Sequence, residues 1–348
     1  MAVADELRAR GAEVSFLGTR ERIEAELVPA AGYEIDFLAV RGIDRHNPLR
    51  AAGAAWRAAL AVPTARGAIR RREAVAVLGG GGFVAGPAGL AAVSLRVPLI
   101  LTEADGHLGL ANRLLAPWAR RVCLAFPIAG REGERYLLTG RPVPAAVLAA
   151  DRDRARERFG IESGARCLLV VGGSQGARSI NRCALVAFAE REGRDYHVLH
   201  LAGRRDHAEL AARLDGALGS RHYSLLDYEP DLGEALAACD LVLARAGGSI
   251  FEVAAAGRPA ILVPYPHATA DHQTRNARWM ADAGAAIVIE DAALEPALLA
   301  ETVRRLFADP ARLAAMAAAS AALARPDAAA RVADELLGAA EARSGRRR

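Results

Sequence analysis

Residues 244–276 read ARAGGSIFEVAAAGRPAILVPYPHATADHQTRN, and this stretch decides the fold. It begins at the end of an apolar strand predicted over Leu241–Leu243. Gly247–Gly248 come next, and Ser249 followed by Glu252 has the spacing of a capping box at a helix start. Glycines at a strand-to-helix turn let backbone N–H groups approach an anion, and the helix dipole adds partial positive charge. The turn is therefore predicted to hold a diphosphate.

A second strand, predicted over residues 259–264, leads into a polar turn. Because the carboxyl ends of parallel strands meet at one edge of the sheet, this turn and the glycine turn are expected to share a ligand site. Each residue alone fits a structural role equally well, and only the combination within one strand-helix-strand-helix unit favours a ligand. The polar turn carries His267, Asp271, His272, Gln273 and Asn276.

Strands and helices alternate along the rest of the chain, which predicts an α/β fold with two doubly wound, Rossmann-like domains. The Pro-rich stretch 140–144 is the predicted linker, so the domains are expected at 1–144 and 145–327. A final Ala-rich helix at 328–342 is long enough to return to the first domain. The expected strands are 13–17, 35–40, 75–78, 98–101, 122–125, 167–171, 197–201, 224–226, 240–243, 260–263 and 286–289.

Residues 1–10 have the pattern of the later turns of a helix, without a strand before them. In a doubly wound domain the first strand lies in the middle of the sheet and its turn carries a ligand loop. We therefore expect this first strand to be encoded upstream of Met1. The strands at 13–17 and 75–78 are then expected to lack a neighbour on one side, which would make the first domain unstable.

The composition excludes several classes of protein. A length of 348 residues suits two domains, and an apolar fraction of 52% argues against disorder. Four scattered cysteines form no C-x-x-C pair, so neither a disulfide framework nor a metal site is expected, and a reducing cytosol fits. The uncharged run 74–95 contains many glycines and is read as strand, loop and helix rather than a membrane span.

The segment Arg41–Arg72 holds eight arginines against one acid, Asp44, with Trp56, Leu60 and Val62 between them. This pattern is typical of a segment that docks on an anionic membrane, although a solvated basic helix face fits equally well. Nucleic acid is not the expected partner, because no aromatic stacking platform accompanies the basic residues.

Two further glycine-rich loops and two longer motifs carry a specific resemblance. The chain resembles the MurG family, which transfers N-acetylglucosamine from UDP-N-acetylglucosamine to muramoyl-pentapeptide on undecaprenyl diphosphate. The resemblance covers nearly the whole chain and implies the GT-B glycosyltransferase fold, in which two Rossmann-like domains face a cleft. The matching segments are GGGGFVAGP at 79–87, TEADGHLGLANRLLAP at 102–117, GGSQGARSIN at 172–181, and RAGGSIFEVAAAGRPAILVPYP with DHQTRNA at 245–277.

The resemblance implies roles for the donor-side residues, and their chemistry is suitable. Glu252 is implied to bind the uridine ribose, since a carboxylate accepts from two neighbouring hydroxyls. Gly247, Gly248 and Ser249 are implied to hold the diphosphate, with Ser174 assisting from the facing loop. Amides both donate and accept hydrogen bonds, which suits sugar hydroxyls. The residues implied to contact the sugar are Gln273 and Asn276, with His272 where the family often has another amide.

The acceptor side departs from the family pattern in several places. The family's Gly-rich loop with a Thr and a proposed acid-base His is missing. Glu103, Asp105 and His107 are the remaining candidates for acid-base work, or Glu103 and Asp105 only orient their loop. Gly81, Gly82, Phe83, Asp105 and Arg141 are the candidate acceptor contacts: Asp105 stands where many members have Asn, Phe83 where Tyr is common, and Arg141 close to Pro144, where many have Arg.

The implied reaction is an inverting transfer on the cytoplasmic face of the cell membrane, without a cofactor or metal, as a step of peptidoglycan synthesis. Three alternatives stay open. Another glycosyltransferase of this fold would use a diacylglycerol or a small-molecule acceptor. A UDP-sugar epimerase would need no acceptor at all. An inactive sugar-nucleotide-binding or membrane-docking protein would bind the donor without turnover.

Overall fold

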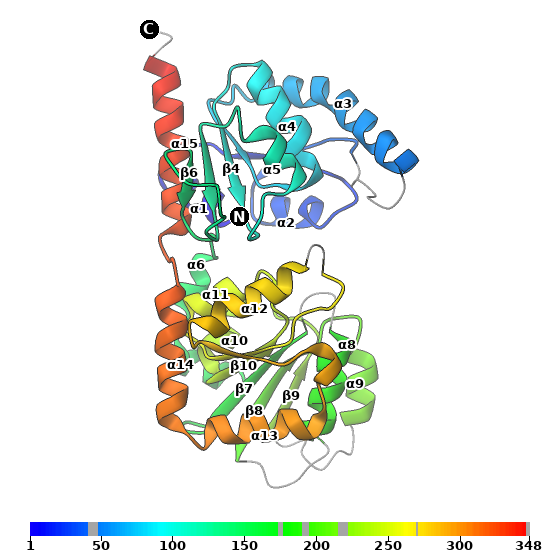
Figure 1. Ribbon diagram of the computed structural model, residues 1–348, viewed down its shortest axis with the longest axis vertical. Coiled ribbons are helices and arrows are strands. Elements are labelled where there is room, and N and C mark those ends of the chain that lie inside the picture. Colours follow the sequence, from blue (N-terminus) through cyan, green and yellow to red (C-terminus); the bar gives the residue numbers. More distant parts are fainter. Residues whose placement is uncertain (41–47, 173–176, 190–194, 215–221, 269–270, 346–348) are drawn as a thin grey trace. The chain divides into compact units, whose positions relative to one another are not determined.

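The structure is a computed structural model that describes residues 1–40, 48–172, 177–189, 195–214, 222–268 and 271–345. The chain divides into two compact units, and both contain parallel sheet with helices (Figure 1). Unit 1 comprises Met1–Pro142 and Asp327–Arg348, and unit 2 comprises Val143–Pro326. The chain therefore changes unit twice, once within the Pro-rich stretch 140–144 and once before the last helix.

Unit 2 is built on one six-stranded parallel sheet with the order β12-β11-β10-β7-β8-β9. Read from β9, this is the 3-2-1-4-5-6 order of a Rossmann fold, in which the direction of winding reverses between β7 and β10. Its strands are nearly continuous apolar runs, as expected for a sheet covered on both faces. The strands are β7 (Arg166–Val171), β8 (Tyr196–Leu201), β9 (Tyr223–Leu226), β10 (Leu241–Ala244), β11 (Ala260–Leu262) and β12 (Ala286–Val288).

The main core of unit 2 forms where apolar side chains of β7, β10 and β11 meet those of α8, η1 and α13. Helices α6 and α7 each pack against α10, and α11 packs against α14. The helices are α6 (Ala145–Ala149), α7 (Arg152–Arg158), α8 (Arg178–Ala184), the π-helix η1 (Leu185–Ala189), α9 (His207–Leu214), α10 (Leu232–Ala238), α11 (Ile250–Ala255), α12 (His272–Asp282), the 3-10 helix η4 (Asp291–Ala293), α13 (Pro296–Phe307) and α14 (Pro310–Leu323).

Unit 1 contains a four-stranded parallel sheet, β3-β4-β5-β6, and a parallel pair, β1-β2. Among the described residues β1 pairs with β2 alone and β3 with β4 alone, so each has one hydrogen-bonded neighbour, as expected from the sequence. The strands are β1 (Ser15–Gly18), β2 (Glu34–Phe37), β3 (Val77–Gly79), β4 (Leu99–Glu103), β5 (Arg121–Leu124) and β6 (Tyr136–Leu138).

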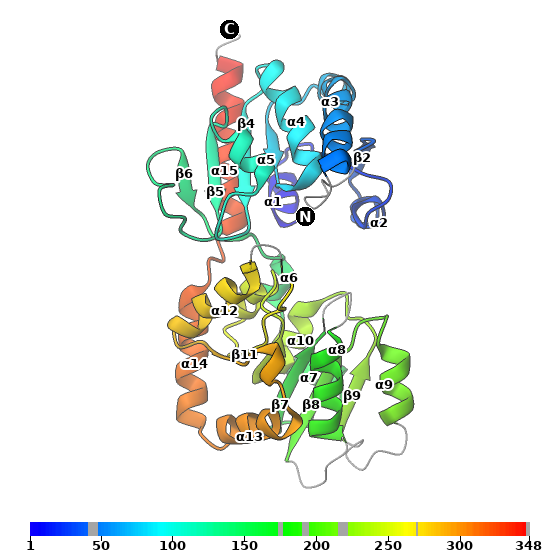
Figure 2. The same ribbon diagram turned by 45° about the vertical axis from the view of Figure 1, so that its right-hand side comes forward.

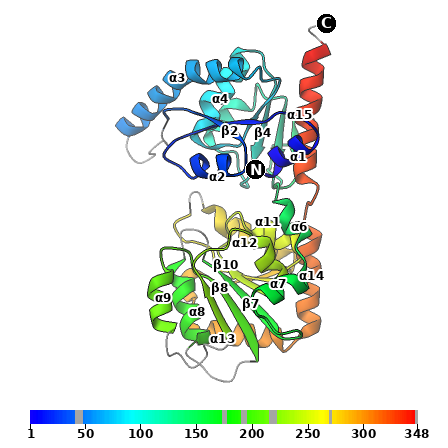
Figure 3. The ribbon, with the colours of Figure 1, turned by 180° about the vertical axis from the view of Figure 1, so that it is seen from behind.

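Two groups of helices cover unit 1. Helix α15 lies beside α1, and both contribute to an apolar cluster with Ile100 and Cys123 of the sheet (Figure 3). Helix α4 packs between α3 and α5 (Figure 2). The helices are α1 (Ala2–Ala9), α2 (Glu24–Ala30), α3 (Pro48–Arg71), α4 (Gly82–Ser94), α5 (Leu110–Leu115) and α15 (Ala328–Gly345).

The structure differs from the sequence-based expectation at three elements. Strand β6 was not predicted, and α15 continues to Gly345, beyond the expected helix end at residue 342. Helix α4 begins at Gly82, so the loop expected within the run 74–95 is short, although glycine and proline usually interrupt helices. Tight packing explains the glycine at position 89 inside α4, because a Cβ there would lie 2.4 Å from the Leu115 side chain of α5.

Within the described part of the chain, no single helix is both long and apolar enough to span a membrane. One bent pair, Pro296–Phe307 with Pro310–Gly345, passes the same test by length and composition.

Candidate functional site

The glycine turn of unit 2 lies where the winding of the sheet reverses. Val171 at the end of β7 is in register with Ala244 at the end of β10. Gly172 follows the first strand, and Arg245 and the turn 246–249 follow the second. The carboxyl edge at such a reversal point is where open α/β sheets bind ligands. The predicted diphosphate turn is therefore placed at the ligand edge of the sheet.

The turn itself corrects one part of the sequence-based prediction. Ser249 has helical dihedral angles (φ −64°, ψ −15°) and makes no side-chain cap hydrogen bond, so the expected capping box is not formed. Helix α11 has only six residues, which limits its dipole. The first N–H groups that bond back are those of Ile250 and Phe251, to the Gly247 and Gly248 carbonyl oxygens at 3.3 Å. Backbone N–H groups of the turn, rather than a capped helix, are thus the candidate anion donors.

Helix α12 holds this turn from the side. The Asn276 amide donates to the carbonyl oxygen of Ala246 at 3.0 Å and is 4% exposed. This burial gives Asn276 a supporting role, whereas a sugar contact was expected. Gln273 accepts a hydrogen bond from the Tyr265 N–H at 2.9 Å, and its Nε2 is 3.9 Å from the position of a Cβ on Gly247. Gln273 therefore lies at the turn.

The remaining donor-side candidates have different positions. Glu252 is half-buried on α11, in the turn after Ser249. His272 is half-buried at the first position of α12, directly after Asp271, whose φ of 53° is rare for a residue with a side chain. Ser174 lies outside the described residues.

A buried polar chain supports the other side of the reversal point. Asn181 on α8 lies so close to Gly172 that a Cβ on this glycine would be 2.7 Å from its Oδ1. Its amide donates to Asp206 at 3.0 Å, which leaves Oδ1 to accept from His200 Nε2 at 3.0 Å. His200 Nδ1 then accepts from the Tyr223 hydroxyl at 2.6 Å. These bonds fix one neutral tautomer of the buried imidazole.

The stability of unit 2 is expected to fall in acid because of His200. Burial lowers the pKa of His200 from 6.5 to about 3. Between these values the unfolded chain binds a proton that the folded chain rejects, so stability falls as the pH drops below 6.5, by up to about 1.4 kcal/mol per pH unit. Hydrogen exchange of β8 amides, corrected for the intrinsic rate, measures the fall. His200→Gln should remove this component, and an unchanged pH slope would contradict the assignment.

In unit 1, Glu103 anchors the loop that follows β4. Its buried carboxylate, in a residue that is 7% exposed, accepts from the backbone N–H groups of Ala104, Asp105 and Gly109 at 2.8–3.3 Å. The Asn112 amide donates to the same carboxylate at 2.9 Å. Four donors leave Glu103 engaged within the protein. The geometry therefore favours the alternative in which Glu103 orients the loop.

The other acceptor-side candidates lie around this loop. Asp105 and His107 are half-buried, and within the described residues the buried His107 Nδ1 has no hydrogen-bond partner. The glycine turn adjoins the loop, because the Asn112 amide is 3.6 Å from the position of a Cβ on Gly81. Gly81 and Gly82 both have positive φ, the guanidinium of Arg22 lies 5.7 Å from the ring of Phe83, and Arg141 is half-buried just before the chain enters unit 2.

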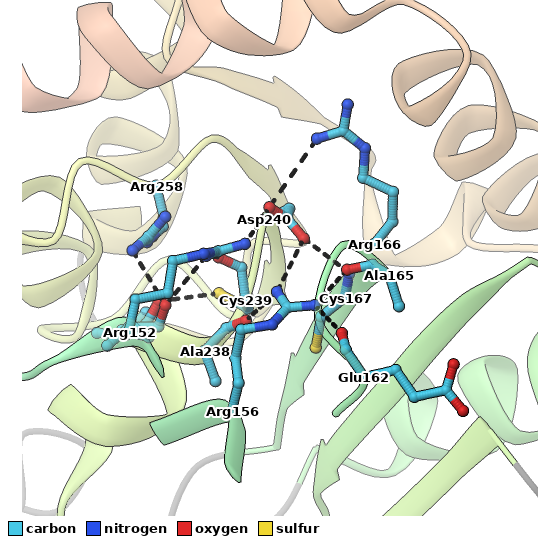
Figure 4. Close-up of polar contacts among 12 residues, drawn as sticks. Arg152, Arg156, Glu162, Ala165, Arg166, Cys167, Ala238, Cys239, Asp240 and Arg258 are labelled. Atoms are coloured by element: carbon cyan, nitrogen blue, oxygen red, sulfur yellow. Dashed lines mark hydrogen bonds and ion pairs between the residues drawn. The ribbon is translucent and has the colours of Figure 1, made fainter. Parts of the chain in front are cut away.

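Figure 4 shows a second polar cluster in unit 2, at the opposite, amino-terminal edge of the sheet. The Asp240 carboxylate, directly before β10, accepts from Arg152 at 2.7 Å and from the Cys167 N–H at 2.8 Å. Arg156 donates to the carbonyl oxygens of Ala238 and Glu162. Arg152 and Arg156 both donate to the last carbonyl oxygens of α10, which stabilises the end of this helix and is a structural use of positive charge.

Sequence reasoning did not single out several polar residues at these edges. Asn112 and Asn181 both lie inside the quoted motifs. The sequence feature that could have singled them out is a lone amide side chain on an apolar helix face. Arg245 stands beside the glycine turn, but its partners Ser179 and Asp291 are distant in sequence.

Metal-ligating side chains and cysteine thiols are two further kinds of group from which a site could be built in the described part of the chain. No group of three or more His, Cys, Asp or Glu side chains there could hold a metal ion. The four cysteines are buried free thiols, and burial raises the pKa of Cys183 to about 11. A thiol with so high a pKa is a poor nucleophile at neutral pH.

Comparison with known proteins identifies the family. Residues 1–124 match the glycosyltransferase family 28 N-terminal domain, and residues 167–332 match the family 28 C-terminal domain. A UDP-N-acetylglucosamine–N-acetylmuramyl-(pentapeptide) pyrophosphoryl-undecaprenol N-acetylglucosamine transferase from Moorella thermoacetica is 41% identical over 327 residues, covering 91% of this chain and 88% of the relative. The crystal structure of Acinetobacter baumannii MurG superimposes with a TM-score of 0.76 at 29% identity, covering 97% and 94% of the two chains. The chain belongs to the MurG family.

Membership of the MurG family confirms the resemblance seen in the sequence and the prediction of a GT-B fold with two Rossmann-like domains. A UDP-GlcNAc 2-epimerase from Neisseria meningitidis, solved with UDP-GlcNAc bound, has a TM-score of 0.67 at 13% identity, covering 97% of this chain and 95% of the epimerase. At this identity the likeness concerns the fold alone.

Proposed function

We propose that this chain transfers N-acetylglucosamine from UDP-N-acetylglucosamine to the muramoyl-pentapeptide carried on undecaprenyl diphosphate, with inversion at the anomeric carbon. The observation that carries the proposal is the glycine turn 246–249 at the reversal point of the unit 2 sheet, in a chain that belongs to the MurG family. Unit 2 is assigned to the donor, and unit 1 with α15 to the acceptor and the membrane.

The donor is held by groups of different chemistry. The N–H groups of Gly247, Gly248 and Ser249 bind the diphosphate, and the Glu252 carboxylate accepts from the ribose hydroxyls. The Gln273 amide, beside Gly247, contacts the sugar, with His272 next to it. Ser174 remains assigned to the diphosphate by resemblance.

In the transfer step the acceptor's sugar hydroxyl attacks the anomeric carbon from the face opposite UDP. A base takes the hydroxyl proton as the bond forms, and UDP departs with the charge of its diphosphate stabilised by the turn N–H groups. Asp105 and His107 are the candidate bases, since Glu103 is engaged by four donors. Gly81, Gly82, Phe83 and Arg141 are assigned to the acceptor.

The release of UDP tests this function against its alternatives. The purified chain is expected to release UDP from UDP-N-acetylglucosamine only when the lipid-linked muramoyl-pentapeptide is added. Release that requires diacylglycerol instead would indicate another glycosyltransferase. Conversion of the UDP-sugar without any acceptor would indicate an epimerase, and binding without either reaction would indicate an inactive sugar-nucleotide-binding protein.

Unit 1 also has a surface suited to the cytoplasmic face of an anionic membrane. Helices α3, α4 and α5 adjoin, and they carry large exposed apolar side chains. Trp56 is 67% exposed, and Trp118, just beyond α5, is 58% exposed. Five such side chains lie on or just beyond these helices, and we call them the exposed apolar set: Trp56, Leu60, Leu90, Leu114 and Trp118. An exposed apolar group with arginines around it is typical of peripheral membrane binding.

The arginines of this region do not all contribute equally. Arg71 and Arg72 form ion pairs with Asp36 and Glu34 of β2, so their charge is already balanced. Arg57, Arg113 and Arg120 are exposed, lie within two residues in sequence of Trp56, Leu114 and Trp118, and are the better candidates for lipid contact. Arg41, the first residue of the basic segment, lies outside the described residues.

Vesicle flotation is expected to separate these contributions. Binding to vesicles with anionic lipid should fall as salt rises, because each surface arginine contributes about 1 kcal/mol that salt screens. Replacing Trp56 and Trp118 with alanine should reduce binding at every salt concentration. Leu298→Ala, which removes an exposed leucine of unit 2, is the matched control and should have no effect. Flotation that is insensitive to both salt and the tryptophans would contradict docking through this surface.

A further inference from the structure

A closed ring of polar contacts lies directly beside the glycine turn of unit 2. Arg245 Nη1 donates to Asp291 Oδ1 at 2.6 Å, and Arg245 Nη2 donates to the Ser179 hydroxyl at 2.7 Å. The Ser179 hydroxyl donates in turn to the same Asp291 oxygen at 2.6 Å. We call Arg245, Ser179 and Asp291 the arginine clasp. Each member contacts the other two, so losing one leaves each of its partners with one contact fewer.

The arginine clasp joins four elements of the ligand edge. Ser179 lies in the first turn of α8, Arg245 follows β10, and Asp291 begins η4 after β12. Arg245 Nη1 also donates to the carbonyl oxygens of Val263 and Pro264 at 3.2 Å, just beyond β11. The clasp thus ties together the chain segments that follow β7, β10, β11 and β12.

The glycine turn is held at two points as a result. Arg245, the residue before the turn, is fixed by the clasp, and the carbonyl oxygen of Ala246 is fixed by Asn276. Only two residues separate Arg245 from Gly248. Donors that already point in the right direction bind an anion without an added cost of ordering. Loosening the clasp would let the turn N–H groups adopt several directions.

The charge of Arg245 is used within the protein. The side chains of Arg245 and Asp291 are 17% and 23% exposed, so solvent screens their attraction less than that of a surface pair. The guanidinium donates to the carboxylate, the hydroxyl and two carbonyl oxygens. This arrangement is suited to positioning the turn rather than to binding phosphate directly.

We propose that Ser179 and Asp291 are positioning residues for the sugar-nucleotide donor, acting through Arg245 on the turn 246–249; the proposal rests on the function proposed above. Their effect is on binding of the donor diphosphate. The acceptor, assigned to unit 1, should not sense them.

Calorimetric titration of the full chain with UDP-N-acetylglucosamine is the test. Asp291→Asn is expected to raise the donor Kd about 10-fold and Ser179→Ala about 3-fold. Because both residues act through one ring, the donor Kd of the double variant should be raised by no more than about 10-fold over wild type, a non-additive result. Asp291→Glu should recover part of the affinity, and the acceptor KM should stay unchanged in all variants.

Glu301→Gln is the matched control, because it removes a carboxylate paired with two arginines on α13 and should leave the donor Kd unchanged. Circular dichroism checks that each variant is folded; should Asp291→Asn unfold, Ser179→Ala and Asp291→Glu carry the test. Wild-type affinity in folded Asp291→Asn, or fully additive effects, would overturn the proposal alone. A wild-type chain that binds no UDP-N-acetylglucosamine would overturn the proposed function and this proposal with it.

Discussion

Replacing Glu252 with alanine is expected to weaken binding of UDP-N-acetylglucosamine about 30-fold, or about 2 kcal/mol. Glu252 is half-buried on α11, in the turn after Ser249, at the ligand edge of the unit 2 sheet. A carboxylate at this place can accept from two neighbouring ribose hydroxyls, and hydrogen bonds to a charged group are stronger than those between neutral groups. UDP should lose affinity by a similar factor, because it shares the ribose.

Isothermal titration calorimetry with UDP and with UDP-N-acetylglucosamine measures both effects. Glu252→Gln keeps one acceptor oxygen and should lose less affinity than Glu252→Ala. A loss seen with the sugar nucleotide but not with UDP would move Glu252 from the ribose to the sugar. Unchanged affinity in a folded Glu252→Ala variant would remove Glu252 from the site altogether.

Replacing Asp240 with alanine is expected to destabilise unit 2 by about 3 kcal/mol. The Asp240 side chain is 13% exposed and lies among Arg152, Arg156 and Arg166 (Figure 4). Removing the carboxylate leaves positive charges close together and also leaves the Cys167 N–H without its acceptor. Breaking one partner of a shielded ion pair costs more than the pair itself contributes, because the remaining charges stay uncompensated.

Urea unfolding monitored by hydrogen exchange of β7 and β10 amides measures this loss. Asp240→Asn retains an acceptor for the Cys167 N–H and should lose less stability than Asp240→Ala. Glu301→Gln, which breaks exposed ion pairs on α13, is the control and should change exchange little. Equal exchange in Asp240→Ala and wild type would show that the cluster does not stabilise the sheet.

The architecture was predictable from the sequence because it depends on local patterns. Short apolar runs predicted every strand of unit 2, and the strand order of a Rossmann fold then placed the glycine turn at the ligand edge. Strand β6 was missed: Tyr136–Leu138 is a short strand with partly exposed side chains, without the buried apolar run that marked the others.

Side-chain roles were less predictable, because they depend on contacts distant in sequence. The spacing of Ser249 and Glu252 fits a capping box, yet the helical dihedral angles of Ser249 do not permit one. Glu103 has the chemistry of a base, but folding of its own loop supplies it with four donors. Arg245 and Asp291 are 46 residues apart, and only the folded sheet brings together the segments that follow β10 and β12, the two neighbours of β11.

Following labelled N-acetylglucosamine from UDP-N-acetylglucosamine into product tests the proposed transfer most directly. With the lipid-linked muramoyl-pentapeptide present, label is expected to enter the lipid fraction in equal amount to the UDP released, and nuclear magnetic resonance is expected to show a β-linked sugar formed from the α-linked donor. Without acceptor, the donor should remain intact. Label that stays in a nucleotide-sugar fraction while the acceptor is unchanged, or an α-linked product, would contradict the proposed transfer.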